Sequence, residues 1–422
     1  MLTSILQAIK KCIPKPLFDA LNPSYHYTLA LLGAIVYRFP SKKLTVIAVT
    51  GTKGKSSTVE MLNAIFEAAG KKTAVLGTIR FKIGDHSRPN KFKMTVPGRF
   101  FIQKFLRQAV NATCDVAIIE LSSEAAKQFR HKFVYLDALV FTNLSPEHIE
   151  SHGSFEKYRE AKLALTESLR NNLKTRSMIV ANVDDKESGT FLNAGAREKY
   201  TFSIKDAGMY EIKPDGISFT FKNTRIESPL RGMFNIYNCL GAATCADAFG
   251  IPVDDIKKGL ENLSIIKGRV EFVKLGQDFD VVVDYAHTSG SLTELYKTFD
   301  TQKKICVLGN TGGGRDKWKR PEMARVADTF CDEIILTNED PYDEAPDKIL
   351  EDMLPGFKLH VPDIIMNRRE AIAEAISRAR SGDAVLITGK GTDPFIMIAH
   401  NKKIPWSDYE VAKEELEKLL NK

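Results

Sequence analysis

The sequence predicts an α/β protein with two domains, each built on a parallel sheet, behind a short helical N-terminal segment. Short apolar runs rich in Val, Ile and Ala recur along the chain without polar alternation, as in DVAIIEL (115–121). Helical patterns separate these runs, and the arrangement begins again near Gly268 after a β-rich patch at 198–231. Such runs suit strands buried on both faces of a parallel sheet, and the intervening helices supply the crossovers.

Size and composition are those of a folded globular protein. The 422 residues correspond to about two to three domains. Hydrophobic residues make up 43% and charged residues 27% of the chain, which excludes a disordered or fibrous protein. The net charge of +7 is spread along the chain, so it indicates either a solvated basic surface or an anionic substrate such as a nucleotide or phosphosugar. No block of Lys and Arg with interleaved aromatic residues occurs, and we expect no nucleic-acid partner.

The six cysteines are scattered and form no Cys-x-x-Cys pair, which argues against a zinc ribbon. Cys114, Cys239, Cys245 and Cys306 lie in apolar patterns, so we expect small buried thiols in a reducing compartment. The first residues, MLTSILQAIKKCIPKP, place lysines where the apolar core of a secretory signal would lie. We therefore expect a cytoplasmic protein.

The N-terminal segment, residues 1–40, has a mostly helical pattern punctuated by prolines. Its longest apolar stretch, 25–37, contains His26 and is too short to span a bilayer. We expect a helix that packs on the protein core. The alternative is a peripheral contact with a membrane surface.

Residues 41–268 and 269–422 are predicted as the two α/β domains, the second of them smaller and Rossmann-like. In the first domain we expect strands at 44–50, 72–78, 115–121, 137–144 and 177–183. In the second we expect strands at 280–286, 304–310, 332–338 and 383–389.

A phosphate-binding loop follows the first predicted strand directly. TGTKGKSST (50–58) lies between that strand and a helical pattern, which is the arrangement that a nucleotide triphosphate needs. The glycines allow backbone amides to approach phosphate oxygens, and the helix N-terminus adds partial positive charge. In such a loop Lys55 reaches the β- and γ-phosphates and Ser56 binds Mg²⁺. Val49 occupies the position of the first glycine in the general pattern, which indicates one subgroup of P-loop ATPases.

The loop resembles the ATP loop of the Mur ligase superfamily, and further motifs agree with it in order. They are TNLSPEHIESHGSFEKYREAKLALTE (142–167), GMFNIYNCLGAA (232–243), GRVE (268–271), DYAHTSGSL (284–292) and GNTGGGRDKWKRPEMA (309–324). The resemblance covers residues 42–400 and is strongest to the branch that performs the third amino-acid addition in peptidoglycan synthesis. It implies that ATP phosphorylates a peptide carboxylate and that an amine attacks the acyl phosphate, which releases ADP and phosphate.

The resemblance also implies a set of ATP and Mg²⁺ ligands. Glu120 ends a predicted strand at the sheet edge where α/β proteins place their sites, and His148 follows the next strand. Both would bind Mg²⁺ together with Ser56, and Lys162 would do so after carboxylation to a carbamate, an anionic oxygen ligand. The alternative is that Lys162 is an ordinary lysine on the protein surface.

The remaining expected contacts divide between nucleotide and peptide. Nucleotide ligands are Gly51, Thr52, Gly54, Lys55, Ser56, Ser57, Asn238, Arg269, Asp284 and His287. Lys55, Glu120, His148, Lys162 and Lys319 are the expected catalytic residues, and Arg320 is expected beside Lys319. Expected substrate ligands are Thr95, Ser122, Ser123, Gln128, Arg130, Arg315, Asp340 and Tyr342. The expected partners are a UDP-linked or related muropeptide and a free amino acid, bound by a monomer.

Two departures from the family pattern concern the substrates. Only a segment of 40 residues precedes the first predicted α/β domain, where the family normally carries a domain that binds UDP. The family's Asp-Asn-Pro-Arg element is here EDPY (339–342), and the loss of its Arg removes a bidentate carboxylate clamp. We therefore expect that meso-diaminopimelate is not the preferred acceptor. The acidic residues Glu339, Asp340, Asp343 and Glu344 suit a cationic side chain such as that of lysine or ornithine, and the alternative is an acidic surface loop.

The sequence thus favours an ATP-dependent ligase that adds an amino acid to a UDP-N-acetylmuramoyl peptide. One alternative is a related ligase that acts on a lipid-linked, non-UDP or polyglutamate acceptor. An alternative of another class is a nucleotide-binding assembly protein without ligase activity. Release of ADP that depends on an acceptor distinguishes the ligases from the assembly protein.

Overall fold

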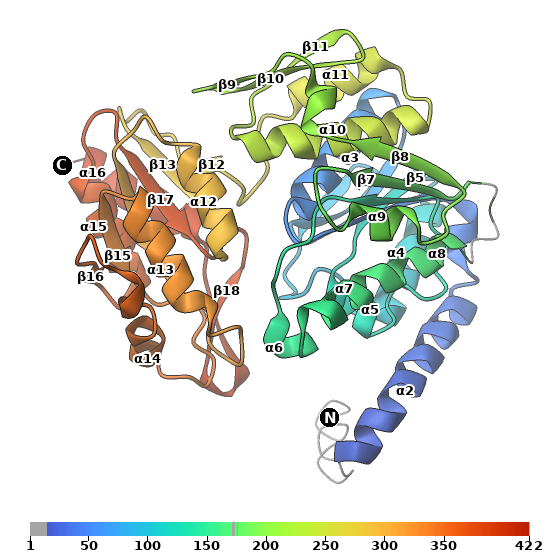
Figure 1. The fold of residues 1–422 in the computed structure, drawn as a ribbon, viewed down its shortest axis with the longest axis horizontal. Coiled ribbons are helices and arrows are strands. Elements are labelled where there is room, and N and C mark those ends of the chain that lie inside the picture. The colour runs from blue at the N-terminus through green and yellow to red at the C-terminus, as the bar shows by residue number, and fades with distance from the viewer. Residues whose placement is uncertain (1–14, 171–173, 175, 422) are drawn as a thin grey trace.

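The computed structural model describes residues 15–170, 174 and 176–421. Residues 1–14 of the predicted N-terminal segment, Cys12 among them, lie outside this range. The described part begins with helix α2 (Lys15–Val36), which extends away from the rest of the molecule (Figure 1). Only Ala30, Gly33 and Ala34 of its apolar stretch are buried. The expectation of a helix packed on the core is therefore confirmed only along one narrow edge.

The central sheet has eight strands in the order β4-β3-β2-β5-β1-β6-β7-β8. These are β1 (Thr45–Thr50), β2 (Thr73–Leu76), β3 (Arg80–Ile83), β4 (His86–Pro89), β5 (Val116–Glu120), β6 (Ala138–Phe141), β7 (Met178–Asn182) and β8 (Glu198–Phe202). All neighbours from β2 to β8 pair in parallel, whereas β3 and β4 add an antiparallel edge. The predicted parallel-sheet domain is confirmed.

Successive residues of β1 face opposite cores, which explains the absence of polar alternation. Val46 and Ala48 pack in one apolar cluster, while Ile47 and Val49 pack in the other. Helices α3 (Lys55–Ala68), α10 (Met233–Ala248) and α11 (Val253–Asn262) cover the second face. The first face is covered by α4 (Arg99–Asn111), α5 (Ser123–Lys127), α7 (Phe155–Leu163), α8 (Glu167–Arg170) and α9 (Ser188–Leu192). Between α5 and α7 stands the short helix α6 (Ile149–His152).

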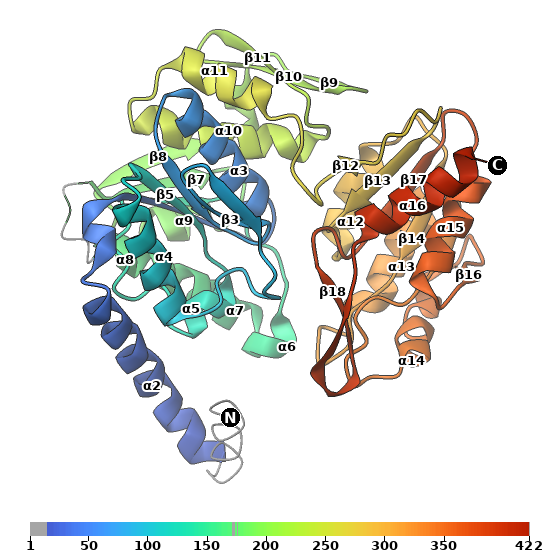
Figure 2. The ribbon, with the colours of Figure 1, turned by 180° about the vertical axis from the view of Figure 1, so that it is seen from behind.

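The β-rich patch expected at 198–231 divides between two sheets. Its first strand, β8, joins the central sheet. The remaining strands, β9 (Glu211–Lys213), β10 (Gly216–Phe221) and β11 (Thr224–Ser228), form a separate antiparallel sheet. This small sheet packs against α10 and α11 (Figure 2).

The C-terminal sheet has the order β12-β13-β17-β14-β15-β16. Its strands are β12 (Glu271–Phe272), β13 (Asp280–Asp284), β14 (Lys304–Leu308), β15 (Glu333–Leu336), β16 (Asp363–Ile364) and β17 (Ala384–Thr388). Helices α12 (Ser289–Lys297), α13 (Lys319–Phe330) and α14 (Pro346–Glu351) line one face, and α15 (Arg368–Arg378) and α16 (Asp408–Leu420) line the other. A hairpin, β18 (Phe395–Ile398) and β19 (Lys402–Pro405), projects from it. The predicted smaller α/β domain is confirmed.

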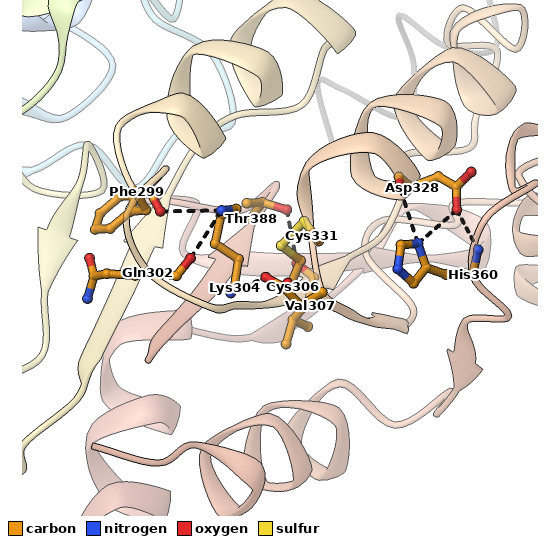
Figure 3. The surroundings of a disulfide bond; sticks show 10 residues. Phe299, Gln302, Lys304, Cys306, Val307, Asp328, Cys331, His360 and Thr388 are labelled. Carbon is orange, nitrogen blue, oxygen red and sulfur yellow. Dashed lines mark hydrogen bonds and ion pairs between the residues drawn. A yellow bond between two sulfur atoms is a disulfide. The ribbon is translucent and has the colours of Figure 1, made fainter. Parts of the chain in front are cut away.

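A disulfide bond joins strand β14 to the end of helix α13 in the C-terminal domain, and it corrects the expectation for Cys306. Cys306 in β14 bonds Cys331, which follows α13, across a sequence separation of 25 residues (Figure 3). The prediction that Cys306 is a free thiol was wrong, because α13 packs on the sheet face that Cys306 occupies. Cys114, Cys239 and Cys245 are buried free thiols, as expected.

No helix within the described residues is both long enough and apolar enough to cross a membrane.

Candidate active site

One cavity of 740 Å³ lies at the carboxyl ends of both parallel sheets, lined by residues of the central and C-terminal domains. It collects nearly all the side chains that the sequence singled out. They are Thr52, Gly54, Lys55, Ser56, Ser57, Thr95, Glu120, Ser122, Ser123, Gln128, Arg130, His148, Asn238, Arg269, Asp284, His287, Arg315, Lys319, Asp340 and Tyr342. Gly51 of the phosphate loop and Lys162 do not line this cavity, and they contact each other.

The phosphate loop has the backbone that its glycines permit. Gly54 adopts a left-handed conformation (φ 79°) immediately before α3, so the helix begins at Lys55. A Cβ at Gly54 would lie 2.2 Å from Oδ1 of Asn238, and any other residue would push this asparagine away. The Lys55 ammonium donates to the Thr52 carbonyl at 2.8 Å and thus folds back over its own loop. The loop therefore presents amides, a helix N-terminus and a cation to one space.

Glu120 and Ser56 meet at the base of the loop. The Ser56 hydroxyl donates to Oε2 of Glu120 at 3.1 Å, and the backbone amide of Thr78 donates to the same oxygen at 2.9 Å. Glu120 ends β5, which pairs with β1, so the sheet register itself brings this carboxylate beside the loop.

Lys162 is buried rather than on the surface, with 1% of its side chain accessible. Its ammonium donates to the Gly51 carbonyl at 2.6 Å and lies 4.9 Å from the centre of the Tyr158 ring. Burial and the nearby Lys55 hold the pKa of Lys162 well below its ordinary value. The alternative of a plain surface lysine is excluded by this environment.

Glu147 connects the two domains and was missed by the sequence analysis. Its carboxylate lies 3.2 Å from Nε2 of His287 and 4.0 Å from Nε2 of His148. His287 also contacts the Tyr285 carbonyl through Nδ1 at 2.7 Å. Burial lowers the pKa of His148 to about 4, so this imidazole is neutral near pH 7. The signal in the sequence was the acidic residue directly before His148.

Arg269 of the C-terminal domain contacts the phosphate loop of the central domain. Its guanidinium donates to the Ser56 hydroxyl at 3.4 Å and lies 4.4 Å from the Tyr285 ring centre. Asp284 accepts hydrogen bonds from the backbone amides of Val270 and Ala286. The Asp284 carboxylate therefore holds the two loops that present Arg269 and His287, in addition to lining the cavity.

Asn238 and Asn235 lie inside α10, whose first residue is Met233, so neither is an N-cap. Nδ2 of Asn238 donates to Oδ1 of Asn235, whose own amide donates to the Arg231 carbonyl. These bonds direct the Asn238 carbonyl oxygen toward Gly54.

Lys319 and Arg320 differ in their roles although they are adjacent. The Lys319 ammonium donates to the His287 carbonyl at 3.2 Å inside the cavity. The Arg320 guanidinium is fully buried and bonds Glu344 at 2.9 Å and Asp352 at 2.7 Å. The expectation that Arg320 acts beside Lys319 was wrong, because both of its carboxylate partners are structural neighbours outside the cavity lining.

A second bridge between the domains involves Glu150 at the start of α6. Its backbone amide donates to Oδ1 of Asp316 at 2.8 Å, while its carboxylate accepts from the Lys317 amide at 2.9 Å. The loop that carries Arg315 is thereby fixed against the central domain.

The side expected to bind the sugar peptide is built around Arg130, whose side chain is 5% exposed. Its guanidinium donates to Oε1 of Gln128 at 2.7 Å and to the Val96 carbonyl. The Thr95 hydroxyl lies 2.9 Å from that of Thr78. Neutral acceptors therefore hold the Arg130 charge in place.

Ser122 and Ser123 open helix α5 at the end of β5. The Ser122 hydroxyl accepts from the Ala125 amide and caps the helix. The Ser123 hydroxyl lies 3.2 Å from Nε2 of His152, which is itself 3.6 Å from Glu124. His152 therefore supports the serine pair from behind.

The expected acidic clamp for a cationic acceptor is largely neutralised by internal partners. Asp340 accepts from Lys390 at 2.9 Å through both oxygens, from the Met397 amide, and from Lys93 of the central domain. Glu344 pairs with Arg320 and Lys317, and Asp343 accepts from the His400 amide. The interpretation of all four carboxylates as one cation site was therefore wrong.

Glu339 keeps one oxygen available. Oε1 accepts from the Thr311 hydroxyl at 2.7 Å, whereas Oε2 is buried and has no hydrogen-bond partner in the described part of the chain. The ring of Tyr342, which stands where the family has Arg, lies 5.4 Å from the Lys93 ammonium. Tyr342 also lies beside Arg315 and raises the pKa of its guanidinium.

The residues expected to bind Mg²⁺ fit that ion only together with an anionic substrate. Among the residues that the structure describes, no three His, Cys, Asp or Glu side chains gather as a metal site. Ser56 and Glu120 supply a hydroxyl and a carboxylate 3.1 Å apart, which suits Mg²⁺ because this ion retains waters and takes phosphate oxygens. A protonated Lys162 does not fit as a ligand, whereas its carbamate does.

Comparison with known proteins decides the family. A family model described as the Mur ligase middle domain matches residues 49–246, and one described as Mur ligase, glutamate ligase domain, matches residues 268–391. The chain belongs to the Mur ligase family. As a Mur ligase it is an enzyme that forms an amide bond, and the alternative of an assembly protein without activity is set aside.

Relatives of this Mur ligase cover most of its length. A protein of Bacillus velezensis named UDP-N-acetylmuramoyl-L-alanyl-D-glutamate--2,6-diaminopimelate ligase is 39% identical over 407 residues, which are 93% of this chain and 82% of the relative. A protein of Syntrophomonas wolfei with the same name is 35% identical, covering 94% of this chain and 83% of the relative.

Solved structures support the fold of this Mur ligase. A ligase structure of the same name matches with a TM-score of 0.60 at 27% identity and covers 89% of this chain and 79% of its own. Folylpolyglutamate synthase of Mycobacterium tuberculosis, solved with ADP and AMPPCP, matches with a TM-score of 0.70 at 15% identity, over 87% and 93% of the two chains. At this lower identity the likeness shows the fold alone.

Proposed function

We propose that this Mur ligase uses ATP to add an amino acid to UDP-N-acetylmuramoyl-dipeptide in peptidoglycan precursor synthesis. The observation that carries the proposal is the meeting of the phosphate loop, Glu120 and Arg269 in one cavity that also holds Arg130. The relatives, which are named as ligases of UDP-N-acetylmuramoyl-L-alanyl-D-glutamate and 2,6-diaminopimelate, support the addition of an amino acid to this dipeptide. We further propose a monomeric, cytoplasmic enzyme, with the domain boundaries 1–40, 41–268 and 269–422.

The chemistry divides into two steps. The dipeptide carboxylate attacks the γ-phosphorus of ATP, so that an acyl phosphate forms and ADP leaves. The amine of the acceptor then attacks the acyl carbon, and phosphate leaves with the bonding electrons while the amine loses a proton. Positioning and charge stabilisation supply most of the catalysis in phosphoryl transfer.

Residues of both domains surround the transferred phosphoryl group in this proposal. Lys55 and the loop amides hold the β- and γ-phosphates, and Asn238 lies on the adenine side. Arg269 and Lys319 bring positive charge from the C-terminal domain. Their hydrogen bonds to the Ser56 hydroxyl and the His287 carbonyl support this placement.

Ser56, Glu120 and His148 would hold Mg²⁺, which would neutralise charge on the phosphates. Because His148 has a lowered pKa, it offers a neutral imidazole at physiological pH. Glu147 lies beside it and fixes His287.

We also propose that Lys162 is carboxylated. Carbamate formation needs an unprotonated amine, and burial lowers the pKa of Lys162. In the protein equilibrated with ¹³C-bicarbonate, a carbamate signal in the NMR spectrum should appear and should be absent from Lys162→Ala. Electron density that ends at Nζ, together with full activity of Lys162→Ala, would contradict the modification.

For the acceptor we propose an amino acid with a second amino group and without a distal carboxylate, such as lysine or ornithine. Tyr342 cannot form the bidentate clamp that an Arg offers a carboxylate, and Oε2 of Glu339 is left to accept from an ammonium group. A panel of amino acids should give the highest kcat/KM with such an acceptor. Highest kcat/KM with meso-diaminopimelate would contradict this assignment.

The test of the main proposal is phosphate release from ATP in the presence of UDP-muramoyl-dipeptide and the amino-acid panel. Release should require both substrates, and Lys55→Ala should abolish it. Phosphate release that is independent of the dipeptide, or none with any acceptor, would contradict the proposal.

A further inference from the structure

Helix α2 lies against the segment that carries the sugar-peptide ligands. The Tyr27 ring packs edge-on against Phe133 at 5.2 Å and Phe129 at 6.5 Å between ring centres. His26, one residue before, contacts the Arg99 guanidinium at the start of α4 through Nδ1. The helix is thus tied to residues 128–133, directly beside Arg130.

Two guanidinium groups converge on Gln128. Nε of Arg99 donates to its backbone carbonyl at 2.8 Å, and Nη2 of Arg130 donates to its side-chain oxygen at 2.7 Å. No carboxylate lies within 4.0 Å of either guanidinium among residues 15–170, 174 and 176–421. Their fixed partners are neutral oxygens, an imidazole and the Met94 sulfur.

One hydrogen-bond donor of the Arg99 and Arg130 guanidiniums has no partner within the described residues. Nε of Arg130 is buried and has no hydrogen-bond partner in the part of the chain that the structure describes. Arg130 lines the cavity, so this donor lies at the wall of the substrate space. Burial and the neighbouring Arg99 charge lower the pKa of Arg130 to about 10. Arg130 is buried and Arg99 is partly buried, so the two like charges repel each other in a poorly solvated place, and a bound anion would relieve the repulsion.

We infer that Arg99, Arg130 and His26 form a diphosphate subsite that holds the carrier group of the muropeptide, with α2 as one of its walls. The inference rests on the proposed function and names a part of the same site. A carboxylate is satisfied by one guanidinium, whereas a diphosphate offers enough oxygens and charge for two guanidiniums and an imidazole.

The position of the pair agrees with this ligand. The reacting carboxylate must lie near Glu120 and Ser56, so the carrier leaves the cavity at its rim. Arg130 lies on the cavity wall, and the cationic groups continue from it through Arg99 to His26 on α2. A nucleoside diphosphate and a polyprenyl diphosphate share this chemistry, and the experiment separates them.

The test crosses enzyme variants with substrates. Arg99→Ala and Arg99→Lys are compared with the wild type and with Lys104→Ala, which removes an exposed charge from the same helix. The substrates are UDP-muramoyl-dipeptide, the polyprenyl-diphosphate-linked form in detergent, and muramoyl-dipeptide without a diphosphate. Arg99→Ala should raise KM for the diphosphate substrates about 10- to 100-fold. Arg99→Lys should recover part of this loss, and Lys104→Ala should behave as the wild type.

The substrate without a diphosphate separates binding from a merely structural role of Arg99. Its KM should be the same for Arg99→Ala and the wild type. An equal rise in KM for all three substrates, or no rise at all, would overturn the inference. If Arg99→Ala does not fold, as judged by circular dichroism, Arg99→Lys carries the same comparison. The carrier with the lower KM in the wild type identifies the source of the diphosphate.

Failure of the proposed function is distinguishable from failure of this inference. If the wild type turns over none of the substrates, binding of UDP-muramoyl-dipeptide is measured by calorimetry with the phosphate loop saturated by a non-hydrolysable ATP analogue. Weaker binding by Arg99→Ala than by Lys104→Ala would support the subsite although the ligase reaction fails. Equal binding by both, or no binding by the wild type, would overturn it.

Discussion

Arg269 of the C-terminal domain donates a hydrogen bond to the hydroxyl of Ser56, the residue that follows the phosphate-loop lysine in the central domain, at 3.4 Å. The bond connects two residues that are 213 positions apart in the chain. It places a cation of the C-terminal domain beside the phosphate loop of the central domain. The two domains are therefore in direct contact at the phosphate loop.

Arg269→Ala should lower kcat about 100- to 1,000-fold, the usual cost of removing one donor that stabilises transition-state charge. The Tm should change little, because within the described residues the guanidinium hydrogen-bonds only Ser56 and the Gly268 carbonyl and packs on one face of Tyr285. Steady-state kinetics and thermal melting check both expectations. Lys274→Ala, at an exposed position nearby, is the control. A decrease in kcat of less than tenfold would contradict a role for Arg269 in phosphoryl transfer.

Lys93→Ala should weaken binding of the acceptor amino acid. Lys93 reaches from the central domain to Asp340 and lies near Asp393 at 3.6 Å, so it joins the two domains beside the acceptor pocket. KM for the amino acid should rise about tenfold, which corresponds to the loss of one charge-assisted hydrogen bond. KM for ATP should stay the same. Lys91→Ala, an exposed neighbour, should have no effect. A parallel rise in KM for ATP would show instead that Lys93 governs domain closure as a whole.

Glu344→Gln should change the pH dependence of stability. The Arg320 guanidinium holds the pKa of Glu344 at about 2, below its ordinary value of 4.5. A lowered folded-state pKa means that the stabilisation is complete above about pH 4.5 and is lost as the pH falls toward 2. The variant should be less stable by about 2 kcal/mol at pH 7, and this difference should shrink between pH 4.5 and 2.

Urea unfolding at pH 7, 4 and 2.5 measures the change. Glu351→Gln, whose partner Lys348 is exposed, is the control and should be neutral at each pH. A constant difference between Glu344→Gln and the wild type across this range would mean that the ion pair with Arg320 adds nothing to stability.

Reduction of the disulfide should destabilise the C-terminal domain. The bond between Cys306 and Cys331 closes a loop of 25 residues, for which the chain-entropy model gives about 3 kcal/mol. Dithiothreitol should lower the Tm of the wild type and leave the Cys306→Ala/Cys331→Ala variant unchanged. An identical Tm of the wild type with and without reductant would show that the two thiols are not bonded in solution.

The sequence by itself determined the fold class, the positions of the strands and the phosphate loop. The apolar runs at 44–50 and 115–121 contain β1 and β5, and the loop at 50–58 follows β1 as expected. These features depend on local periodicity and on the backbone freedom of glycine. Both can be recognised from residues that are neighbours in the sequence. The division into domains at 40 and 268 and the roles of the site residues stay predictions.

Only the tertiary structure decided which charges are free to act. Lys319 and Arg320 are adjacent in the sequence. Lys319 lies in the cavity, whereas Arg320 forms ion pairs with Glu344 and Asp352. Asp340 is neutralised by Lys93 and Lys390, which lie far from it in the chain. The pairing of a charged side chain depends on contacts between distant segments, and so does the burial that lowers the pKa of Lys162. The sequence of a single segment does not indicate which distant segments it contacts. These contacts could therefore be identified only from the folded chain.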